Sequence, residues 1–260
     1  MTSMLVAKTL TGADREKELV SEFFGGAPGF FAEVGANDPR YGSQSWHLEQ
    51  AGWRGVLVEP LPDLADKLRA ERKAQVFGVA CSSPANAGQM LTLHAAGPLS
   101  SLDRSRMSAG ALPETTIEVP VQTLDAILTE AAAPVPLDFL SIDVEGHELE
   151  VLSGFDLARW RPRLILIEDY VADLTKHRLL RRSGYQLIRR TDSNGWYVPE
   201  DAPVSIALRD RWEILRKYYL ALPFRVFRNF SRRLRQPFKD RRALRDRVAR
   251  VQAEIQRGRD

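Results

Sequence analysis

The chain has 260 residues, 44% of them apolar, and a single cysteine, Cys81. This apolar content can fill a hydrophobic core without a structural metal, and one cysteine excludes an intrachain disulfide. We find no secretory signal pattern at residues 1–10 and no apolar run of 18 residues or more. We therefore expect a cytoplasmic protein of a reducing compartment.

The net charge of +3 hides an uneven distribution along the chain. Residues 209–260 hold 17 Lys and Arg against 6 Asp and Glu, whereas residues 1–208 hold 20 against 28. We interpret this as an acidic domain, residues 1–208, followed by a basic helical extension, residues 209–260. Two parts of opposite charge indicate two kinds of partner.

Short apolar runs predict strands, in chain order, at 29–34, 55–59, 74–80, 90–94, 117–121, 137–142, 163–168, 185–190 and 196–198. Helical spacing predicts helices at 46–51, 64–72, 124–130 and 148–153, and a turn is expected at 192–195. Strands that read as continuous apolar runs and alternate with helices form a parallel sheet covered on both faces. The pattern predicts a doubly wound α/β domain, in which ligands bind at the carboxyl ends of the strands.

Polar residues follow the five main strands, and four of the five strand ends carry an acid. Because the carboxyl ends of parallel strands meet at one edge of the sheet, these residues define the expected ligand site. In chain order the strand ends are Glu33-Val-Gly35-Ala-Asn37, Glu59-Pro60, Ala80-Cys81, Asp143-Val-Glu145-Gly-His147 and Glu168-Asp169.

The first two strand ends indicate a nucleoside without a pyrophosphate. Gly35 directly after a strand allows close approach of the backbone to a ligand, and Glu59 ends the next strand, where a carboxylate commonly binds two ribose hydroxyls. The Gly-x-Gly-x-x-Gly fingerprint is absent, and so is a phosphate-binding loop. S-adenosylmethionine fits these features, with its adenine near residues 80–82. The alternative is a plain glycine turn with a solvent-exposed glutamate.

Two segments carry a family resemblance: "EVGANDPRYGSQSWHLEQAGWRGVLVEPLPDL", residues 33–64, and "LDFLSIDVEGHELEVLSGFD", residues 137–156, continued by "RPRLILIEDY" at 161–170. They resemble the FkbM-type S-adenosylmethionine-dependent methyltransferases over about residues 29–170, with weaker likeness at 97–103 and 119–128. The resemblance implies the class I methyltransferase fold, a Rossmann-like, mostly parallel seven-stranded sheet whose last strand is antiparallel. It also implies methyl transfer to oxygen, usually to a sugar hydroxyl of a glycan or glycosylated metabolite.

We therefore expect a set of residues to bind S-adenosylmethionine at the strand ends. The set is Glu33, Gly35, Asn37, Glu59, Pro60, Ala80, Cys81 and Asp143.

Three ionisable residues after the fourth main strand are the candidates for catalysis: Asp143, Glu145 and His147. An alcohol is a poor nucleophile, so its proton must pass to a base or its oxygen must bind a metal. In an extended segment the three side chains point to one side. Either His147 is the general base, oriented by an acid, or the acids bind Mg²⁺. The alternative for His147 is a residue that caps the following helix.

The candidate ligands for Mg²⁺ come from two neighbouring strand ends. Asp143 and Glu145 follow one strand, and Glu168 and Asp169 follow the next. Carboxylates without further cysteines favour a hard cation over zinc. Glu168 and Asp169 could serve the metal or the base.

Two further segments are expected to contact the acceptor or a partner. The polar segment 97–107 is either an acceptor-binding lid or an ordinary long connection. In the extension, Phe227, Phe230 and Leu234 recur at helical spacing with arginines on the other side, and Pro223 suits a helix start. A short apolar seam follows at Leu244, Val248, Val251 and Ile255. Three partners suit this extension: an anionic membrane or lipid-linked acceptor at its surface, the acidic body or another copy in a homo-oligomer, and, least favoured, nucleic acid.

Four functional hypotheses follow, and we rank an O-methyltransferase acting on carbohydrate first. An RNA ribose methyltransferase predicts a basic body and a lysine near the strand ends, and we see neither in the sequence. A non-catalytic scaffold predicts loss of the cofactor residues or of the Asp143 cluster, which are retained. A dehydrogenase is the weakest hypothesis because the glycine fingerprint is missing.

Overall fold

The structure is a computed structural model that describes residues 12–95, 115–171 and 174–227. The chain groups into two compact units. Unit 1 contains residues up to 170 together with residues 175–211, and unit 2 contains residues 171–174 and those from 212 onward. The assignment of separate functions to residues 1–208 and 209–260 stays a prediction.

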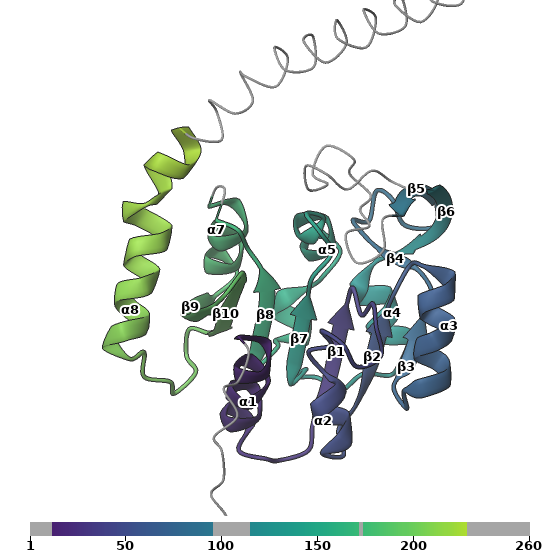
Figure 1. Cartoon of the computed structure of the whole chain (residues 1–260), viewed down its shortest axis with the longest axis horizontal. Helices are drawn as coiled ribbons and strands as arrows, with labels where there is room; N and C mark the ends of the chain where they lie inside the picture. Colours follow the sequence, from purple (N-terminus) through teal and green to yellow (C-terminus); the bar gives the residue numbers. More distant parts are fainter. Residues whose placement is uncertain (1–11, 96–114, 172–173, 228–260) are drawn as a thin grey trace, which may run out of the picture. The chain divides into compact units, whose positions relative to one another are not determined.

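Unit 1 is built on a seven-stranded sheet (Figure 1) in the order β3-β2-β1-β7-β8-β10-β9. Strands β1, β2, β3, β7 and β8 are parallel, whereas β10 runs antiparallel to both β8 and β9. This confirms the expected doubly wound, mostly parallel sheet with an antiparallel last strand. The strands are β1 (Phe30–Val34), β2 (Arg54–Val58), β3 (Gln75–Phe77), β7 (Phe139–Ile142), β8 (Leu164–Glu168), β9 (Tyr185–Thr191) and β10 (Asn194–Pro199).

The expected helices are present, and α1, α6 and α7 were not predicted from the sequence. The α6 helix had a readable signal, because the Asp156 side chain caps its first turn by accepting from the Ala158 and Arg159 N–H groups. The helices are α1 (Gly12–Phe24), α2 (Trp46–Gln50), α3 (Pro62–Glu71), α4 (Leu124–Glu130), α5 (Glu148–Ser153), α6 (Leu157–Trp160), α7 (Thr175–Arg182) and α8 (Leu208–Ile214). A π-helical segment, Leu215–Leu220, follows α8.

One face of the sheet is covered by the first three helices. Phe24 of α1, Leu48 of α2 and Leu68 of α3 join one hydrophobic cluster with sheet residues such as Phe31 and Trp196. These side chains are almost fully buried. Their burial supplies the hydrophobic free energy that fixes the helices on this face.

The other face is packed by later helices, because strand side chains alternate between the two faces. Tyr197, the neighbour of Trp196, lies within 3.1 Å of His177 Nδ1 on α7. The indole of Trp160 on α6 donates to Asp125 on α4 over 2.7 Å, which ties these two helices together. Both faces are thus covered, as the continuous apolar strands predict.

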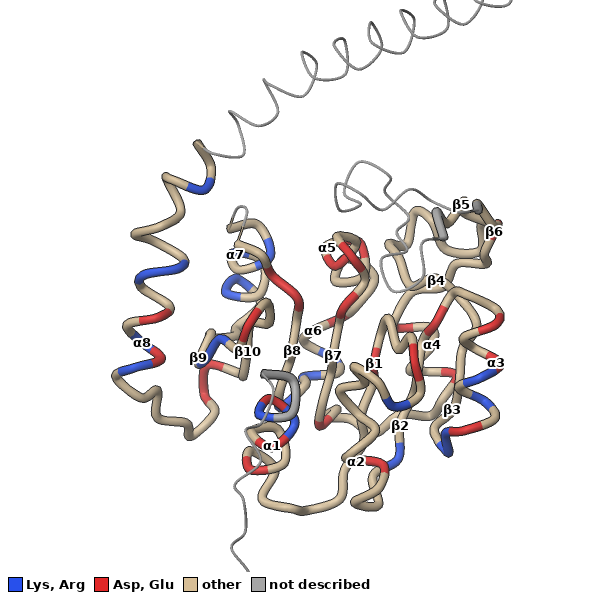
Figure 2. The backbone as a smooth tube through the Cα atoms, viewed as in Figure 1, with Lys and Arg blue, Asp and Glu red and all other residues tan. Residues whose placement is uncertain are grey.

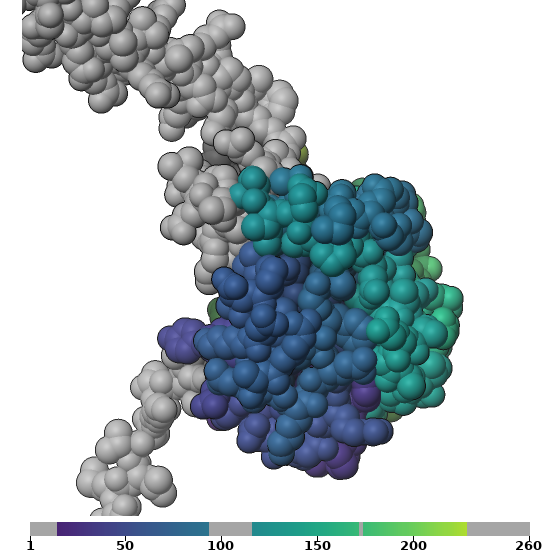
Figure 3. Space-filling model, turned by 90° about the vertical axis from the view of Figure 1, so that its right-hand side faces the viewer, coloured from purple at the N-terminus to yellow at the C-terminus, as the bar shows by residue number. Residues whose placement is uncertain are grey.

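A second sheet forms where one long strand was expected at 74–80. The chain breaks at residues 78–79, so that β3 pairs with β2 while β4 (Ala80–Cys81) pairs with β6 (Thr115–Gln122), which also pairs with β5 (Met90–Ala95). Residues 75–77 hydrogen-bond to β2 in the first sheet and residues 80–81 to β6 in the second, so the expected strand at 74–80 is divided between the two sheets. Figure 3 shows this side of the molecule, with blue residues near α3 beside teal residues near β6.

Within unit 2, the described helical chain continues through residues 222–227, and Pro223 lies in the first turn of that helix as expected. The apolar seam at 244–255 and the segment 97–107 lie outside the described residues. In the part of the chain that the structure describes, no helix has both the length and the apolar character to cross a membrane.

Candidate active site

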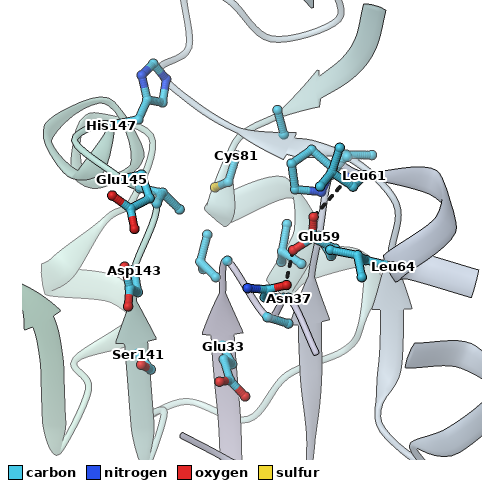
Figure 4. Close-up of a pocket in the computed structure, with 18 of the residues that line it drawn as sticks. Glu33, Asn37, Glu59, Leu61, Leu64, Cys81, Ser141, Asp143, Glu145 and His147 are labelled. Atoms are coloured by element: carbon cyan, nitrogen blue, oxygen red, sulfur yellow. Dashed lines mark hydrogen bonds between the residues drawn. The ribbon is translucent and has the colours of Figure 1, made fainter. Parts of the chain in front are cut away.

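A pocket of about 230 Å³ opens at the carboxyl ends of β1, β2 and β7, beside β4 (Figure 4). It brings together all the residues that we predicted for cofactor binding and for catalysis, although they come from four separate parts of the sequence. These lining residues are Glu33, Gly35, Asn37, Glu59, Pro60, Ala80, Cys81, Asp143, Glu145 and His147.

Glu59 is held in a fixed orientation at one side of this pocket. Its Oε2 accepts from the Asn37 N–H over 2.8 Å, and its Oε1 accepts from the Leu61 N–H over 2.9 Å. Burial raises the pKa of this carboxyl. Asn37 adopts a left-handed conformation, φ 50°, which asparagine tolerates better than most residues. Each oxygen of Glu59 keeps acceptor capacity for a hydroxyl of a bound ribose.

A glycine is required at position 35 for two reasons, its left-handed backbone conformation and its close approach to the backbone of Asp143. Its φ is +84°, and an added Cβ would lie 1.8 Å from the carbonyl oxygen of Asp143. The ends of β1 and β7 therefore approach each other only because residue 35 has no side chain. The expected close approach is real, but the group that the glycine accommodates is the backbone of Asp143.

Glu33 is buried, and its carboxylate accepts hydrogen bonds from the loop that follows β1. Its Oε1 accepts from the Gln44 N–H over 2.6 Å, and its Oε2 accepts from the hydroxyls of Ser43 and Ser45. Both carboxylate oxygens are therefore engaged within the protein. Glu33 reaches the pocket wall, but its hydrogen bonds place it in the support of the loop at residues 43–45.

Arg72, at the end of α3, holds the same loop from the other side and was not found from the sequence. Its guanidinium donates to the carbonyl of Pro39 over 2.9 Å, to Ser45 Oγ over 2.9 Å and to Ser43 Oγ over 3.2 Å. A buried arginine is rare without a specific partner. No sequence motif signals this role, because these three partners in the loop lie 27 to 33 residues away in the chain.

An apolar wall completes the pocket opposite the acids. It extends the predicted contacts at Pro60 and Ala80 with side chains that the sequence analysis missed. The signal was available for two of them, because Leu61 follows Glu59-Pro60 directly and Leu64 comes three residues later. The added residues are Leu61, Leu64, Val79 and Leu93.

Three carboxyl groups gather at the ends of β7 and β8. Asp143, Glu145 and Glu168 each offer an oxygen, and these oxygens lie within 4.8 Å of one another. Burial, together with repulsion from the neighbouring acids, raises the pKa of Asp143 to about 7 and that of Glu168 to about 8. Asp143 is open to the pocket, yet the surrounding protein removes much of its water. Figure 2 shows acidic segments, in red, at these ends of β7, β8 and α5.

The backbone explains which acids meet. Ile142 pairs with Ile167 across the parallel strands, so the next residues, Asp143 and Glu168, are neighbours. Glu145 does not continue the strand, because its φ is +49° and that of Gly146 is +94°. The expectation of an extended segment with Asp143, Glu145 and the later histidine on one side was therefore wrong, since the chain turns immediately after β7.

His147 lies apart from the carboxyl cluster. Its Nε2 is 2.9 Å from Ser82 Oγ, which also accepts from Asn86 Nδ2 over 3.0 Å. Figure 4 places the imidazole beyond Glu145 as seen from Asp143. The ring makes no capping hydrogen bond to α5, so the capping alternative does not describe it. The His147 side chain therefore lines the pocket beside Ser82 and not beside the three carboxyl groups.

Asp169 is buried outside the cluster, where its Oδ1 lies 4.0 Å from Lys176 Nζ. Lys176 also donates to Glu148 over 3.0 Å and to the carbonyl of Glu168 over 2.6 Å. A lysine is therefore present near the strand ends, contrary to the reading of the sequence. It is held by these acceptors, and it is not among the residues that line the pocket.

The strand order and the position of the pocket define the class I methyltransferase fold. The sequence matches the methyltransferase FkbM domain over residues 33–187, more than half of the chain. The chain belongs to this family of methyltransferases.

Two solved structures share a distant likeness to this chain. The N-terminal domain of human METTL16, in complex with SAH, is 14% identical, with 74% of this chain and 71% of that chain covered at a TM-score of 0.39. A methyltransferase from Geobacter sulfurreducens is 13% identical, with 75% and 91% covered at a TM-score of 0.36. Comparison with curated protein sequences gave no match. The assignment of fold therefore rests on the strand order and the family.

Proposed function

We propose that this protein is an S-adenosylmethionine-dependent O-methyltransferase that acts on a sugar hydroxyl of a carbohydrate-containing acceptor. The observation that carries the proposal is the position of Glu59. Its carboxylate is oriented by two backbone N–H groups inside a pocket whose opposite side holds Asp143. A ribose acceptor and a set of proton-accepting groups thus face the same cavity.

The pocket residues fit the parts of this cofactor. Glu59 offers acceptors to the ribose hydroxyls, and the apolar wall at Leu61, Leu64 and Val79 suits the adenine ring. Gln44 also lines the pocket, and its Nε2 donates to Glu16 over 2.9 Å. Its Oε1 is buried without a partner among the described residues.

The carboxyl cluster supplies a proton acceptor for the acceptor alcohol. S-adenosylmethionine supplies the electrophilic methyl group on a sulfonium. Asp143 has a pKa of about 7, so it ionises near neutral pH while still binding a proton well. This is the range in which a general base is most effective. Because His147 interacts with Ser82, we favour Asp143, with Glu145 or Glu168, over His147 as the base.

The same three carboxylates fit a hard cation by donor type, and Mg²⁺ stays a prediction. Asp143, Glu145 and Glu168 would hold it, and Asp169 is not part of this group. Such an ion would lower the pKa of an alcohol at the site.

A carbohydrate acceptor is supported by the chemistry around the cluster. Several carboxylate oxygens can each accept from one hydroxyl of a sugar. Tyr170 hydrogen-bonds to Glu168, and its side chain is largely exposed. A flat aromatic ring beside hydroxyl acceptors suits the two kinds of surface, apolar and polar, that a sugar presents. The acidic surroundings do not favour the phosphates of RNA.

The decisive experiment is calorimetric titration of the purified protein with S-adenosylhomocysteine, with and without Mg²⁺. We expect one-to-one binding, at least tenfold weaker in Glu59→Gln, whereas Glu130→Gln, a change of an exposed residue at the end of α4, should bind as the wild type does. Methyl transfer is then assayed on a panel of sugars, glycolipids and an RNA oligonucleotide. Absence of binding in both conditions would refute the enzyme and favour a non-catalytic scaffold. Binding with methylation of RNA alone would refute the carbohydrate acceptor.

A further inference from the structure

The described part of unit 2 exposes an unusual amount of apolar surface. Twelve large hydrophobic side chains are exposed among the described residues, and seven of them lie between residues 212 and 227. Concentration of such side chains on one segment marks an interaction surface. We call it the 212–227 surface; its apolar members, 44% to 78% exposed, are Trp212, Leu215, Tyr219, Leu220, Phe224, Val226 and Phe227.

The apolar side chains are arranged along a helix. Trp212 lies in α8, and Leu215 and Tyr219, four residues apart, lie in the π-helical segment that follows it directly. Phe224 and Phe227 are three residues apart in the following helix and are also exposed. The surface therefore consists of exposed large side chains on two successive helical stretches, and three of these side chains are tryptophan or phenylalanine.

Cations accompany these side chains. Residues 212–227 contain Arg216, Lys217 and Arg225 against the single acid Glu213. Glu213 lies 2.8 Å from Lys217 Nζ and 3.8 Å from an Nη atom of Arg216, so it offsets part of their charge. Figure 2 shows Lys and Arg, in blue, recurring along this helical stretch. In the sequence, residues 228–260 add 12 Lys and Arg against 4 Asp and Glu.

We propose that the 212–227 surface docks on an anionic phospholipid membrane. Tryptophan and tyrosine favour the interface between headgroups and acyl chains, and Lys and Arg can extend their charges toward lipid phosphates. Pairing with the same segment of a second copy would bring together two regions that carry 17 Lys and Arg against 6 Asp and Glu each. That repulsion favours the anionic surface as the occupant. The inference does not depend on the acceptor of the methyl group.

The test is vesicle flotation with the full-length protein. We compare vesicles of neutral phosphatidylcholine with vesicles that contain about one-third phosphatidylglycerol, at roughly 50 mM and 300 mM NaCl. We expect binding to the anionic vesicles alone and clear weakening at the higher salt. Absence of binding, or equal binding to neutral vesicles, would overturn the proposal.

Two variants separate the apolar and the charged contributions. Trp212→Ser/Phe224→Ser/Phe227→Ser should reduce binding at least tenfold, whereas Met90→Ser, an exposed apolar residue on β5, should have no effect. Arg216→Gln/Lys217→Gln removes no apolar contact and should weaken binding roughly fivefold per cation. Circular dichroism and binding of S-adenosylhomocysteine show whether each variant is folded. If the triple variant does not fold, the flotation of Arg216→Gln/Lys217→Gln alone tests the membrane proposal.

The oligomeric state supplies the competing outcome. Light scattering after size exclusion measures the mass of the wild type and of the triple variant. If the triple variant converts a dimer to a monomer and still floats with anionic vesicles as the wild type does, the surface is an interface between copies and the membrane proposal is wrong.

Discussion

Arg72 and Glu49 form a buried ion pair, with Arg72 Nε 2.9 Å from Glu49 Oε2 and side chains that are 1% and 3% exposed. The same guanidinium donates to Pro39, Ser43 and Ser45 in the loop that borders the pocket. The loop at residues 39–45 is thus fixed from outside the pocket, by a residue that does not line it. Preorganisation of a binding loop lowers the entropy lost when a ligand binds.

Replacement of this arginine should weaken both the fold and the site. Arg72→Met leaves Glu49 buried and unpaired, so we expect a loss of about 3–5 kcal/mol in the free energy of unfolding. Affinity for S-adenosylhomocysteine should fall at least tenfold in the fraction that stays folded. Denaturant unfolding and calorimetry measure the two effects.

The matched control is Arg69→Met, which removes an exposed ion pair with Asp66 and should change stability by less than about 1 kcal/mol. The double variant Arg72→Met/Glu49→Leu removes both charges and should recover much of the stability without the affinity. Full affinity in that double variant would show that Arg72 does not position the loop.

Gly35→Ala should be far more damaging than other alanine substitutions at left-handed glycines. A methyl group there meets the Asp143 carbonyl oxygen at 1.8 Å, in addition to the strain of φ +84°. Gly52→Ala is the control, because its φ is +90° but no atom lies within 4 Å of the added carbon. The control should lose about 1–2 kcal/mol from backbone strain alone. Equal melting temperatures for the two variants would contradict the close approach of β1 and β7.

Glu145→Asn should separate stability from activity. Glu145 occupies a left-handed conformation, φ 49°, that asparagine adopts more readily. The substitution also removes one of three neighbouring carboxylates, which repel one another. We expect an unchanged or higher melting temperature and a large fall in methyl transfer. A variant with full activity would remove Glu145 from the catalytic group.

Glu168→Gln should change how stability depends on pH. The carboxyls of an unfolded chain ionise near pH 4, whereas Glu168 and Asp143 have pKa values of about 8 and 7 in the fold. Between pH 4 and these values the folded protein binds protons that the unfolded chain has lost, so its stability falls as the pH rises from about 4 to about 8 and levels off above that.

Replacement by glutamine removes part of that loss, so the gain in melting temperature of Glu168→Gln over wild type should be larger at pH 8.5 than at pH 5.5. Differential scanning fluorimetry with a metal chelator measures this, and Glu130→Gln serves as the exposed control. If the melting temperatures of wild type and Glu168→Gln changed with pH in the same way, Glu168 would have an ordinary pKa.

The strand ends were readable because they depend on local patterns. Apolar runs closed by Glu59-Pro60 or by Asp143 predict strands, and parallel strands must bring their carboxyl ends to one edge. The direction of the side chains after β7 was not readable, because it depends on the φ values of Glu145 and Gly146. The turn at Glu145 and Gly146 separates His147 from the acids that the alternation rule grouped with it.

By itself, the sequence determined the doubly wound class of fold, the edge of the sheet that carries the site and the polar residues at the strand ends that line it, because hydrophobic periodicity and the succession of strands and helices along the chain are local properties. The tertiary structure alone decided which of these residues meet. It grouped Glu168 with Asp143 and placed Asp169 beside Lys176. It also turned Glu33 toward the loop that Arg72 holds. These pairings join residues far apart in the chain, and they are fixed by the buried packing and hydrogen bonds of the folded protein, which no short stretch of sequence encodes.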